Sequence, residues 1–169
     1  MERSKHRGSV LLEFTLVGIP ALFLLISIFE ISRGMWAYHT MTRAVNVGAR
    51  YASLHGQGCS RTGYHCGITV GDVANKIAAA APGISPSALT VTLTSAVSGT
   101  VTCNPLSNCL TDATPWPPAT SGENEPGKEI LITGQYMFRS ALAMVAPGSS
   151  PDSFAATNLG ATSRQLIQF

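Results

Sequence analysis

The sequence predicts an α+β fold, in which a long N-terminal transmembrane helix extends into a small exported domain with a short antiparallel sheet. Three observations indicate this fold. Residues 14–29 carry no charge, apolar residues recur at spacings of three and four as far as Ala52, and residues 89–94 alternate strictly between apolar and polar side chains. The 169 residues are enough for one domain of ordinary size.

The uncharged run fits a helix that crosses a membrane. Ser9–Leu12 extends the run backwards across a single carboxylate, Glu13. As a helix, the residues from Ser9 to Phe29 would rise about 31 Å, which matches a hydrocarbon core of about 30 Å. A cleaved signal peptide would have a shorter apolar region that ends in small residues, whereas this run ends in Phe29 and Glu30. We therefore expect an anchor that stays attached.

The charge distribution predicts the orientation of this anchor. The formal charge of +2 lies in the first eight residues, and residues 9–169 sum to zero. Basic residues flank the cytoplasmic side of a span, so we expect a single pass through the inner membrane, with the N-terminus in the cytoplasm and the rest exported. A balanced domain has no basic face for a phosphate backbone, so no nucleic-acid partner is expected.

Two features of the apolar segment are unusual. Glu13 lies inside it, and a carboxylate in a membrane span is costly and suggests a functional site. A position near the cytoplasmic edge would instead keep Glu13 hydrated. Gly18 and Pro20 predict a kink or a melted turn, because proline cannot donate a hydrogen bond to the carbonyl of Leu16.

Residues 7–14 (RGSVLLEF) resemble the processing site of type IV prepilins. In that class a basic leader ends in Gly, cleavage follows the Gly, and Glu is the fifth residue of the mature chain. Glu13 is the fifth residue from Ser9. Further segments narrow the resemblance to the TadE-like family, the pseudopilins of tight-adherence (Flp-type) pilus systems: Leu12–Val17, Pro20, Phe29–Arg33 and Gly48–Ala52.

Two positions depart from the family pattern. Gly18-Ile19 stands before Pro20 where a single apolar residue is usual, and Ser32 replaces the family's Gly. Neither position touches the processing site.

The resemblance implies a pilin-like fold and a structural or assembly role. It also implies cleavage by a prepilin peptidase between Gly8 and Ser9, with Glu13 and Phe14 as assembly and recognition residues. The implied partners are membrane lipid, that peptidase, other pilins or pseudopilins and the pilus assembly machinery. Cleavage would create an α-amino group on Ser9, one turn before Glu13, able to pair with it in the same chain or in a neighbour. The alternative is an uncleaved anchored domain that binds an envelope partner.

The expected organisation is a cytoplasmic leader over 1–8, a transmembrane helix over 9–32, its exported continuation over 33–55 and a small α+β domain over 56–169. In the continuation, one apolar stripe predicts a packing face: Tyr38, Met41, Val45, Ala49 and Ala52. A second stripe carries polar side chains: His39, Arg43, Asn46 and Arg50. We expect the helix to end near Leu54, before the first glycines of a Gly-rich loop.

The four cysteines form two local pairs on the exported side. An oxidising compartment and this spacing predict the disulfides Cys59–Cys66 and Cys103–Cys109. A metal site built from His55, Cys59, His65 and Cys66 is the alternative, although it lacks the usual C-x2-C spacing. We expect no metal and no cofactor.

The remaining elements follow from local patterns. Residues 71–81 predict an Ala-rich helix with Asp72 as N-cap, ended by Pro82-Gly83. Strands are expected at 89–94, 97–103, 129–138 and 161–169, and a helical turn at 140–146. Residues 112–128 predict an exposed loop in which Glu123 and Glu125 are solvated.

No pattern of a catalytic site is present in the sequence. The histidines and aspartates scatter without a G-x-S-x-G, H-E-x-x-H or paired-carboxylate arrangement. Gly56-Gln57-Gly58 precedes no helix that could cradle a phosphate. We therefore do not expect an enzyme, and a small anchored hydrolase is the least favoured of the three function classes.

Overall fold

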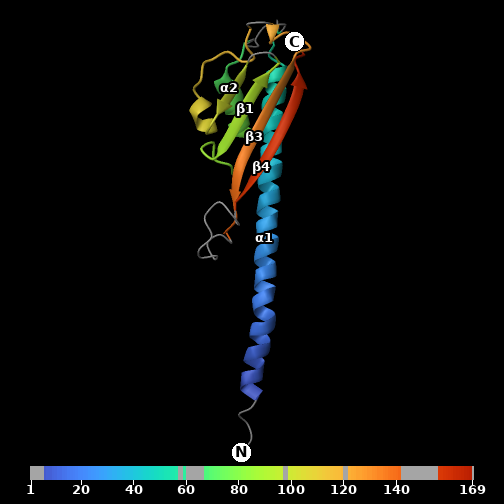
Figure 1. The fold of residues 1–169 in the computed structure, drawn as a ribbon, viewed down its shortest axis with the longest axis vertical. Helices are drawn as coiled ribbons and strands as arrows, with labels where there is room; N and C mark the ends of the chain where they lie inside the picture. The colour runs from blue at the N-terminus through green and yellow to red at the C-terminus, as the bar shows by residue number, and fades with distance from the viewer. Residues whose placement is uncertain are drawn as a thin grey trace, which may run out of the picture. The chain divides into compact units, whose positions relative to one another are not determined.

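The computed structural model describes residues 6–56, 59, 67–96, 99–119, 122–141 and 156–168, with side chains from Leu11 onwards. The chain divides into two compact units, Met1–Met35 and Trp36–Phe169. One helix, α1 (His6–Ser53), runs from the first unit into the second, and its end lies within one residue of the predicted one. The other elements all belong to the second unit (Figure 1).

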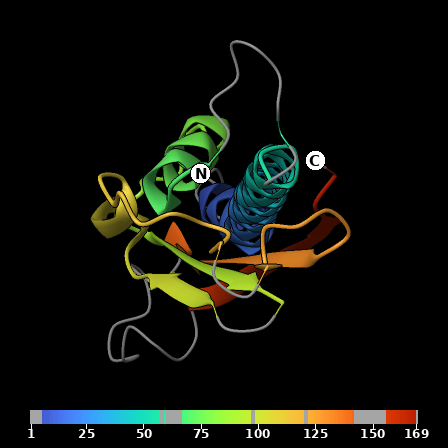
Figure 2. The ribbon, with the colours of Figure 1, turned by 90° about the horizontal axis from the view of Figure 1, so that it is seen from above.

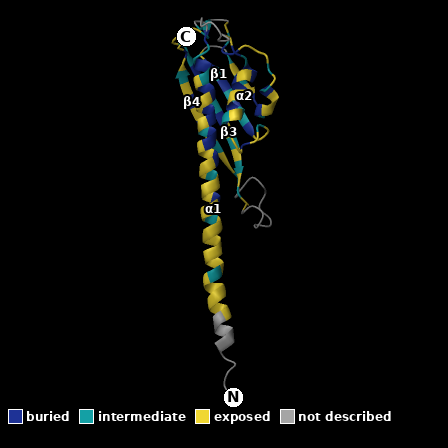
Figure 3. Cartoon of the chain, turned by 180° about the vertical axis from the view of Figure 1, so that it is seen from behind, coloured by how far each residue is buried: buried dark blue, intermediate teal, exposed yellow. Residues whose placement is uncertain are grey.

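In the first unit, α1 presents apolar side chains outward. Leu12, Phe14 and Leu24 are each about two-thirds exposed or more, as are most of their neighbours (Figure 3). The hydroxyls of this stretch donate to carbonyls of their own helix: Thr15 to Leu11, Ser27 to Phe23 and Ser32 to Ile28, at 2.7, 2.8 and 2.8 Å. Internal hydrogen bonding is what a lipid environment requires of polar groups. By length and composition this helix is able to cross a membrane.

The helix continues through Gly18 and Pro20 without a break. The melted turn that proline permits is therefore absent from this part of the helix. A proline removes one hydrogen bond and crowds the preceding turn, and the turns on either side still hold the helix together. A bend at Pro20 stays a prediction.

The second unit is a two-layer α+β domain. Its antiparallel sheet has the order β2-β1-β3-β4, formed by β1 (Leu89–Ser95), β2 (Thr100–Cys103), β3 (Glu129–Arg139) and β4 (Ala156–Leu166). The second part of α1 and helix α2 (Val70–Ala80) lie on one face of this sheet (Figure 2). The strict alternation of β1 buries Leu89, Val91 and Leu93 against the helices, while its threonines face the other way.

Two glycines let the layers approach closely. A Cβ on Gly48 of α1 would lie 2.8 Å from Cδ1 of Ile77 on α2. A Cβ on Gly134 of β3 would lie 2.7 Å from Cγ2 of Val45 on α1. Neither site has room for a side chain. The backbone of α1 at Gly48 packs directly against Ile77 of α2, and the backbone of β3 at Gly134 packs directly against Val45 of α1.

The predicted strands all form, with shifted ends. β4 begins at Ala156 instead of 161, because its pairing with β3 extends as far as Arg139↔Ala156 and holds polar residues that no apolar pattern marks. β2 begins at Thr100, and residues 97–98 lie outside the described residues, as does most of the helical turn predicted at 140–146.

The N-cap prediction for α2 is wrong by three residues. Thr69 is the N-cap: its side chain accepts a hydrogen bond from the backbone N–H of Asp72, and the Asp72 carboxylate accepts one from the N–H of Thr69. This reciprocal pair is a capping box, in which the acidic residue occupies the third helical position.

The loop before β3 is less exposed than predicted. Trp116 is 1% exposed, and its backbone N–H donates to the carbonyl of Ile68 at 2.9 Å. Glu123, expected to be solvated, is fully buried and accepts a hydrogen bond from the Ser95 hydroxyl at the end of β1. Glu125 is exposed, as expected. The buried Trp116 indole packs this loop against the domain. The polar pattern of the loop sequence does not reveal this contact.

Candidate membrane anchor and assembly site

The residues predicted for processing and assembly lie at the start of α1. Gly8 and Ser9 belong to its first helical turn, where only the backbone is described. Glu13 follows Ser9 by four residues, about 6 Å along the helix axis. Its side chain is exposed, and among the described residues it makes no hydrogen bond or ion pair. The chain itself therefore leaves this carboxylate open to a partner.

Phe14 lies beside Glu13 and is 73% exposed. Its ring packs over the next turn, since a Cβ on Gly18 would lie 3.8 Å from Cε1 of Phe14. That distance is an ordinary van der Waals contact, in contrast to the crowded glycines of the domain. The start of α1 thus presents a carboxylate and an aromatic ring on an otherwise aliphatic surface.

An ion pair lies directly after the C-terminal end of the apolar run. Arg33 Nη1 donates to Glu30 Oε1 at 2.8 Å, and the two side chains are 47% and 11% exposed. Both residues belong to the segment Phe29–Arg33 that resembles the family, but no role is predicted for them from the sequence. The signal that could have revealed the pair is the spacing of opposite charges at i and i+3, which places them on one face of a helix.

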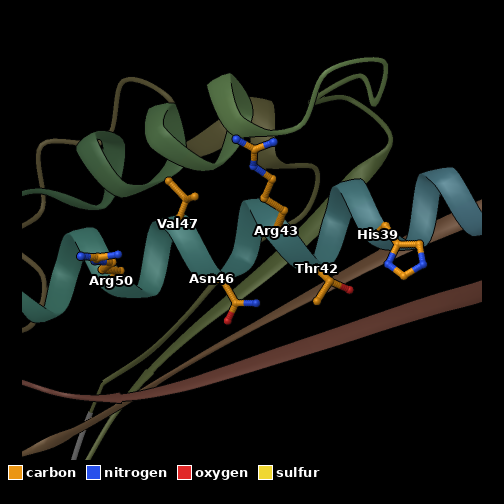
Figure 4. A pocket seen from close by; sticks show the side chains of 6 residues that line it. All are labelled: His39, Thr42, Arg43, Asn46, Val47 and Arg50. Carbon is orange, nitrogen blue, oxygen red and sulfur yellow. The ribbon is translucent and has the colours of Figure 1, made fainter.

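The polar stripe predicted on the second part of α1 is present at the surface. It lines a shallow groove of about 440 Å³ formed by His39, Thr42, Arg43, Asn46, Val47 and Arg50 (Figure 4). Met41, Val45, Ala49 and Ala52 of the apolar stripe are buried, as predicted, but Tyr38 is 40% exposed. Its ring packs edge-on against His39 instead of entering the core.

The end of α1 joins α2 through Tyr51. His55 Nδ1 lies 2.6 Å from the carbonyl of Tyr51, and Lys76 Nζ lies 5.2 Å from the centre of the Tyr51 ring. Burial raises the pKa of Tyr51 above its ordinary value of 10.0, and the Asp72 carboxylate raises this pKa further. The His55 ring thus lies against a backbone carbonyl of the last helical turn.

The disulfide Cys103–Cys109 is confirmed. Its sulfurs lie 2.05 Å apart, and it ties the end of β2 to a short 3-10 helix, η1 (Leu106–Cys109). Cys59 is also disulfide-bonded, while its predicted partner Cys66 lies outside the described residues. A disulfide-bonded Cys59 removes one thiolate from the alternative metal set.

The other residues of the alternative metal set are only partly described. His65, like Cys66, lies outside the described residues, and the ring of His55 lies against the backbone of Tyr51. Among the described residues no three His, Cys, Asp or Glu side chains are grouped so that they could hold a metal ion.

A comparison with protein-family models finds a match to TadE-like protein over residues 8–50. The resemblance predicted from the sequence is thereby confirmed, and the matched segment contains Glu13, the Glu30–Arg33 pair and Gly48. The match supports a protein associated with a tight-adherence (Tad) pilus. No curated protein and no solved structure matches the chain.

Proposed function

We propose that this TadE-like chain is a membrane-anchored, pseudopilin-like subunit that serves a structural or assembly role in a tight-adherence pilus. One observation carries the proposal: the segment matched by the family, residues 8–50, coincides with α1, whose first part presents lipid-compatible side chains and whose second part is the packing element of the domain. A helix of this kind can move from the lipid into a bundle of similar helices, because lipid tails and the apolar side chains of neighbouring helices are similarly apolar surroundings.

Glu13 would set the register of such a bundle. A carboxylate transferred into an apolar bundle without a partner is expensive, whereas one paired with a cation is tolerated and specifies a single arrangement. Cleavage after Gly8 would supply that cation as the α-amino group of Ser9. Within one helix the two groups are a turn apart, and between neighbours a stagger of one turn would bring them together.

The expected placement is the inner membrane, with the domain on the extracytoplasmic side. The basic leader supports this orientation, because cytoplasmic flanks are enriched in Lys and Arg. The Cys103–Cys109 disulfide supports it independently, because disulfides persist in oxidising compartments.

N-terminal sequencing of the membrane-extracted protein tests the processing step. We expect the mature chain to begin at Ser9, and Gly8→Leu to retain the leader, since a bulky side chain should not enter a peptidase site built for glycine. Ser9→Ala is the matched control on the other side of the bond and should still be cleaved. An intact Met1 terminus in cells that carry the peptidase would support the uncleaved anchored domain instead.

A second variant tests the role of Glu13. Glu13→Ala removes a charge from the apolar segment, so membrane insertion should be preserved or improved. We expect the cleaved variant to accumulate in the membrane and yet to fail to support pilus formation, scored by electron microscopy. Normal piliation by cleaved Glu13→Ala would defeat the pairing between Glu13 and Ser9.

A further inference from the structure

The sheet of the domain has two edge strands of very different length. β2 is the short edge, and the disulfide at Cys103 ties its end to η1. β4 is the long edge, with eleven residues that all pair with β3 on one side (Figure 1). The other side of β4 is the outer edge of the sheet.

Backbone groups of alternate β4 residues point out of this edge. The N–H of Ile167 donates to the carbonyl of Lys128, on the β3 side, at 2.9 Å, whereas the N–H of Gln168 donates to Ser53 of α1 at 2.9 Å. Successive residues of a strand alternate in this way, so the N–H and C=O groups of even-numbered β4 residues point away from β3. The residues concerned are all exposed: Asn158, Gly160, Thr162, Arg164 and Leu166. Among the described residues, these outward backbone groups have no hydrogen-bond partner.

β4 lacks the features by which edge strands usually prevent the addition of another strand. Those features are short length, proline, lysine, a β-bulge or a covering segment. The strand contains no proline or lysine, and its one charged residue, Arg164, pairs with Glu129 at 3.0 Å. Its register with β3 is unbroken from Ala156 to Leu166. β4 thus offers a long row of donors and acceptors to an extended peptide, which is the geometry of β-strand addition.

The second part of α1 lies over the inner face of the same strand. Ala161 of β4 is buried and pairs with Gly134, which in turn packs on Val45 of α1. Thr42 and Asn46 point to the side of α1 along which β4 runs (Figure 4). A strand added beside β4 would therefore turn alternate side chains toward this side of α1.

The exposed surface of α1 beside this position is basic. His39, Arg43 and Arg50 line the same groove as Thr42 and Asn46 and are exposed. We call these three residues the basic flank of α1. Among the described residues, no carboxylate lines the groove and none of the three basic side chains is in an ion pair. Acidic side chains on the inner face of an added strand would complement this charge.

A second copy of this chain does not supply such a strand. Its edge strands, β2 and β4, carry no acidic side chain. Antiparallel pairing of two β4 strands would also bring two basic flanks close to each other, and like charges across an interface repel. The partner that fits the edge is therefore a different chain with an extended, acidic segment.

We propose that the outer edge of β4 and the basic flank of α1 together form a docking site for an extended, acidic segment of a partner protein, which joins the sheet as a further strand. Backbone hydrogen bonds to β4 supply the affinity, and the acidic side chains beneath His39 and Arg50 supply the selectivity. The inference concerns the domain and does not rest on cleavage after Gly8 or on Glu13.

Binding of synthetic peptides to the full chain in detergent tests the site. The probe is a fluorescein-labelled peptide of about nine residues that alternates Glu and Thr, long enough to pair with most of β4. Fluorescence anisotropy at low salt measures its Kd. We expect a peptide with Lys in place of Glu to bind at least about tenfold more weakly, because exposed charges attract and repel most strongly at low ionic strength.

Two methylated peptides separate strand addition from simple charge attraction. One carries N-methyl groups on every Thr and the other on every Glu, so each loses the backbone donors of one edge. Only one edge of an added strand faces β4. We therefore expect the two peptides to differ in Kd by at least about tenfold, since each lost hydrogen bond is worth roughly 1 kcal/mol.

A matched pair of variants tests the protein side of the edge. The N–H of Gly160 points outward, and a Cβ there would meet nothing within 4 Å, so both Gly160→Ala and Gly160→Pro fit the strand. Only the proline removes the donor. We expect Gly160→Pro to weaken binding about tenfold and Gly160→Ala to change it by less than about twofold. Arg50→Gln should weaken binding about threefold, whereas Lys76→Gln, which removes the same charge from α2, should not.

Three results would overturn the proposal. Equal Kd values for the two methylated peptides would exclude strand addition, and equal Kd values for the Glu and Lys peptides would exclude an acidic partner. Self-association of the full chain that is lost in Gly160→Pro, measured by sedimentation velocity, would show that a second copy occupies the edge. All of these measurements use the unprocessed chain, so their failure and the failure of the proposed pilus role are distinguishable.

Discussion

The two parts of α1 form one helix but are built for different surroundings. Most side chains of residues 11–29 are bulky and exposed, whereas the second part buries several small residues against the domain, namely Ala37, Ala44, Gly48, Ala49 and Ala52. Bulky aliphatic side chains suit fluid lipid tails, which fill any shape, while small residues permit close approach to fixed protein neighbours. The comparison teaches that small residues gather on a helix where it packs closely against protein, beside the larger buried Met41 and Val45, and are few where it faces lipid.

The two parts of α1 share one kind of hydrogen bond and differ in another. In both parts, hydroxyls donate to carbonyls of their own helix, as Thr15 does to Leu11 and Thr42 does to Tyr38. At the end of the second part, the backbone finds partners far along the chain, as Ser53 does with Gln168. The first part is thus self-sufficient, and the second depends on the domain for its capping.

The largest difference should come from truncating the same side chain in each part. Met41 is fully buried and Met35 is 52% exposed. Met41→Ala should lower the free energy of unfolding of the domain by about 2–5 kcal/mol, because it leaves a cavity between α1 and the sheet. Met35→Ala should change it by less than about 0.5 kcal/mol. Urea unfolding of the full chain in detergent, followed by tryptophan fluorescence in the Trp36→Phe background so that only Trp116 reports, measures both. Equal losses would contradict the comparison.

A second pair of variants sharpens the comparison by adding volume. Gly48→Ala and Gly18→Ala gain the same helix propensity, roughly 1 kcal/mol. At Gly48 the added methyl meets Ile77, so we expect a net loss of unfolding free energy of about 1–3 kcal/mol. At Gly18 it meets only the ring of Phe14 at van der Waals distance. The same unfolding experiment applies, and a stabilised Gly48→Ala domain would show that the helices can separate at little cost.

Most of this contrast is accessible from the sequence. The apolar run, the stripe that includes Met41 and Val45, and the alternation of β1 each depend on periodicity within a few residues, and each is confirmed. The misses depend on contacts between distant segments. Glu123 is buried in the loop that also holds the buried Trp116 against the domain. β4 begins early because its first residues pair with β3.

The residues of the proposed site also differ in how far the sequence reveals them. Glu13 stands out because a charge within an apolar run is visible locally. Processing at Gly8 depends on another protein's specificity, so its prediction rests on the family resemblance and not on the fold of this chain.

The smallest expected effect concerns the junction of the second part of α1 with α2. Burial and the Asp72 carboxylate raise the pKa of Tyr51 above 10.0, so the folded state holds the phenol proton more tightly than the unfolded state does. The contribution of Tyr51 to stability is then complete below the unfolded pKa of about 10 and is lost as pH rises through the higher folded pKa. Tyr51→Phe should therefore flatten the decline of unfolding free energy between about pH 8 and about pH 11, since phenylalanine cannot ionise. Other tyrosines and lysines titrate in both proteins and cancel in the difference. Urea midpoints of the unmodified chain and of Tyr51→Phe, measured across this pH range, test the prediction. An equally steep decline in Tyr51→Phe would show that ionisation of Tyr51 does not affect the stability of the domain.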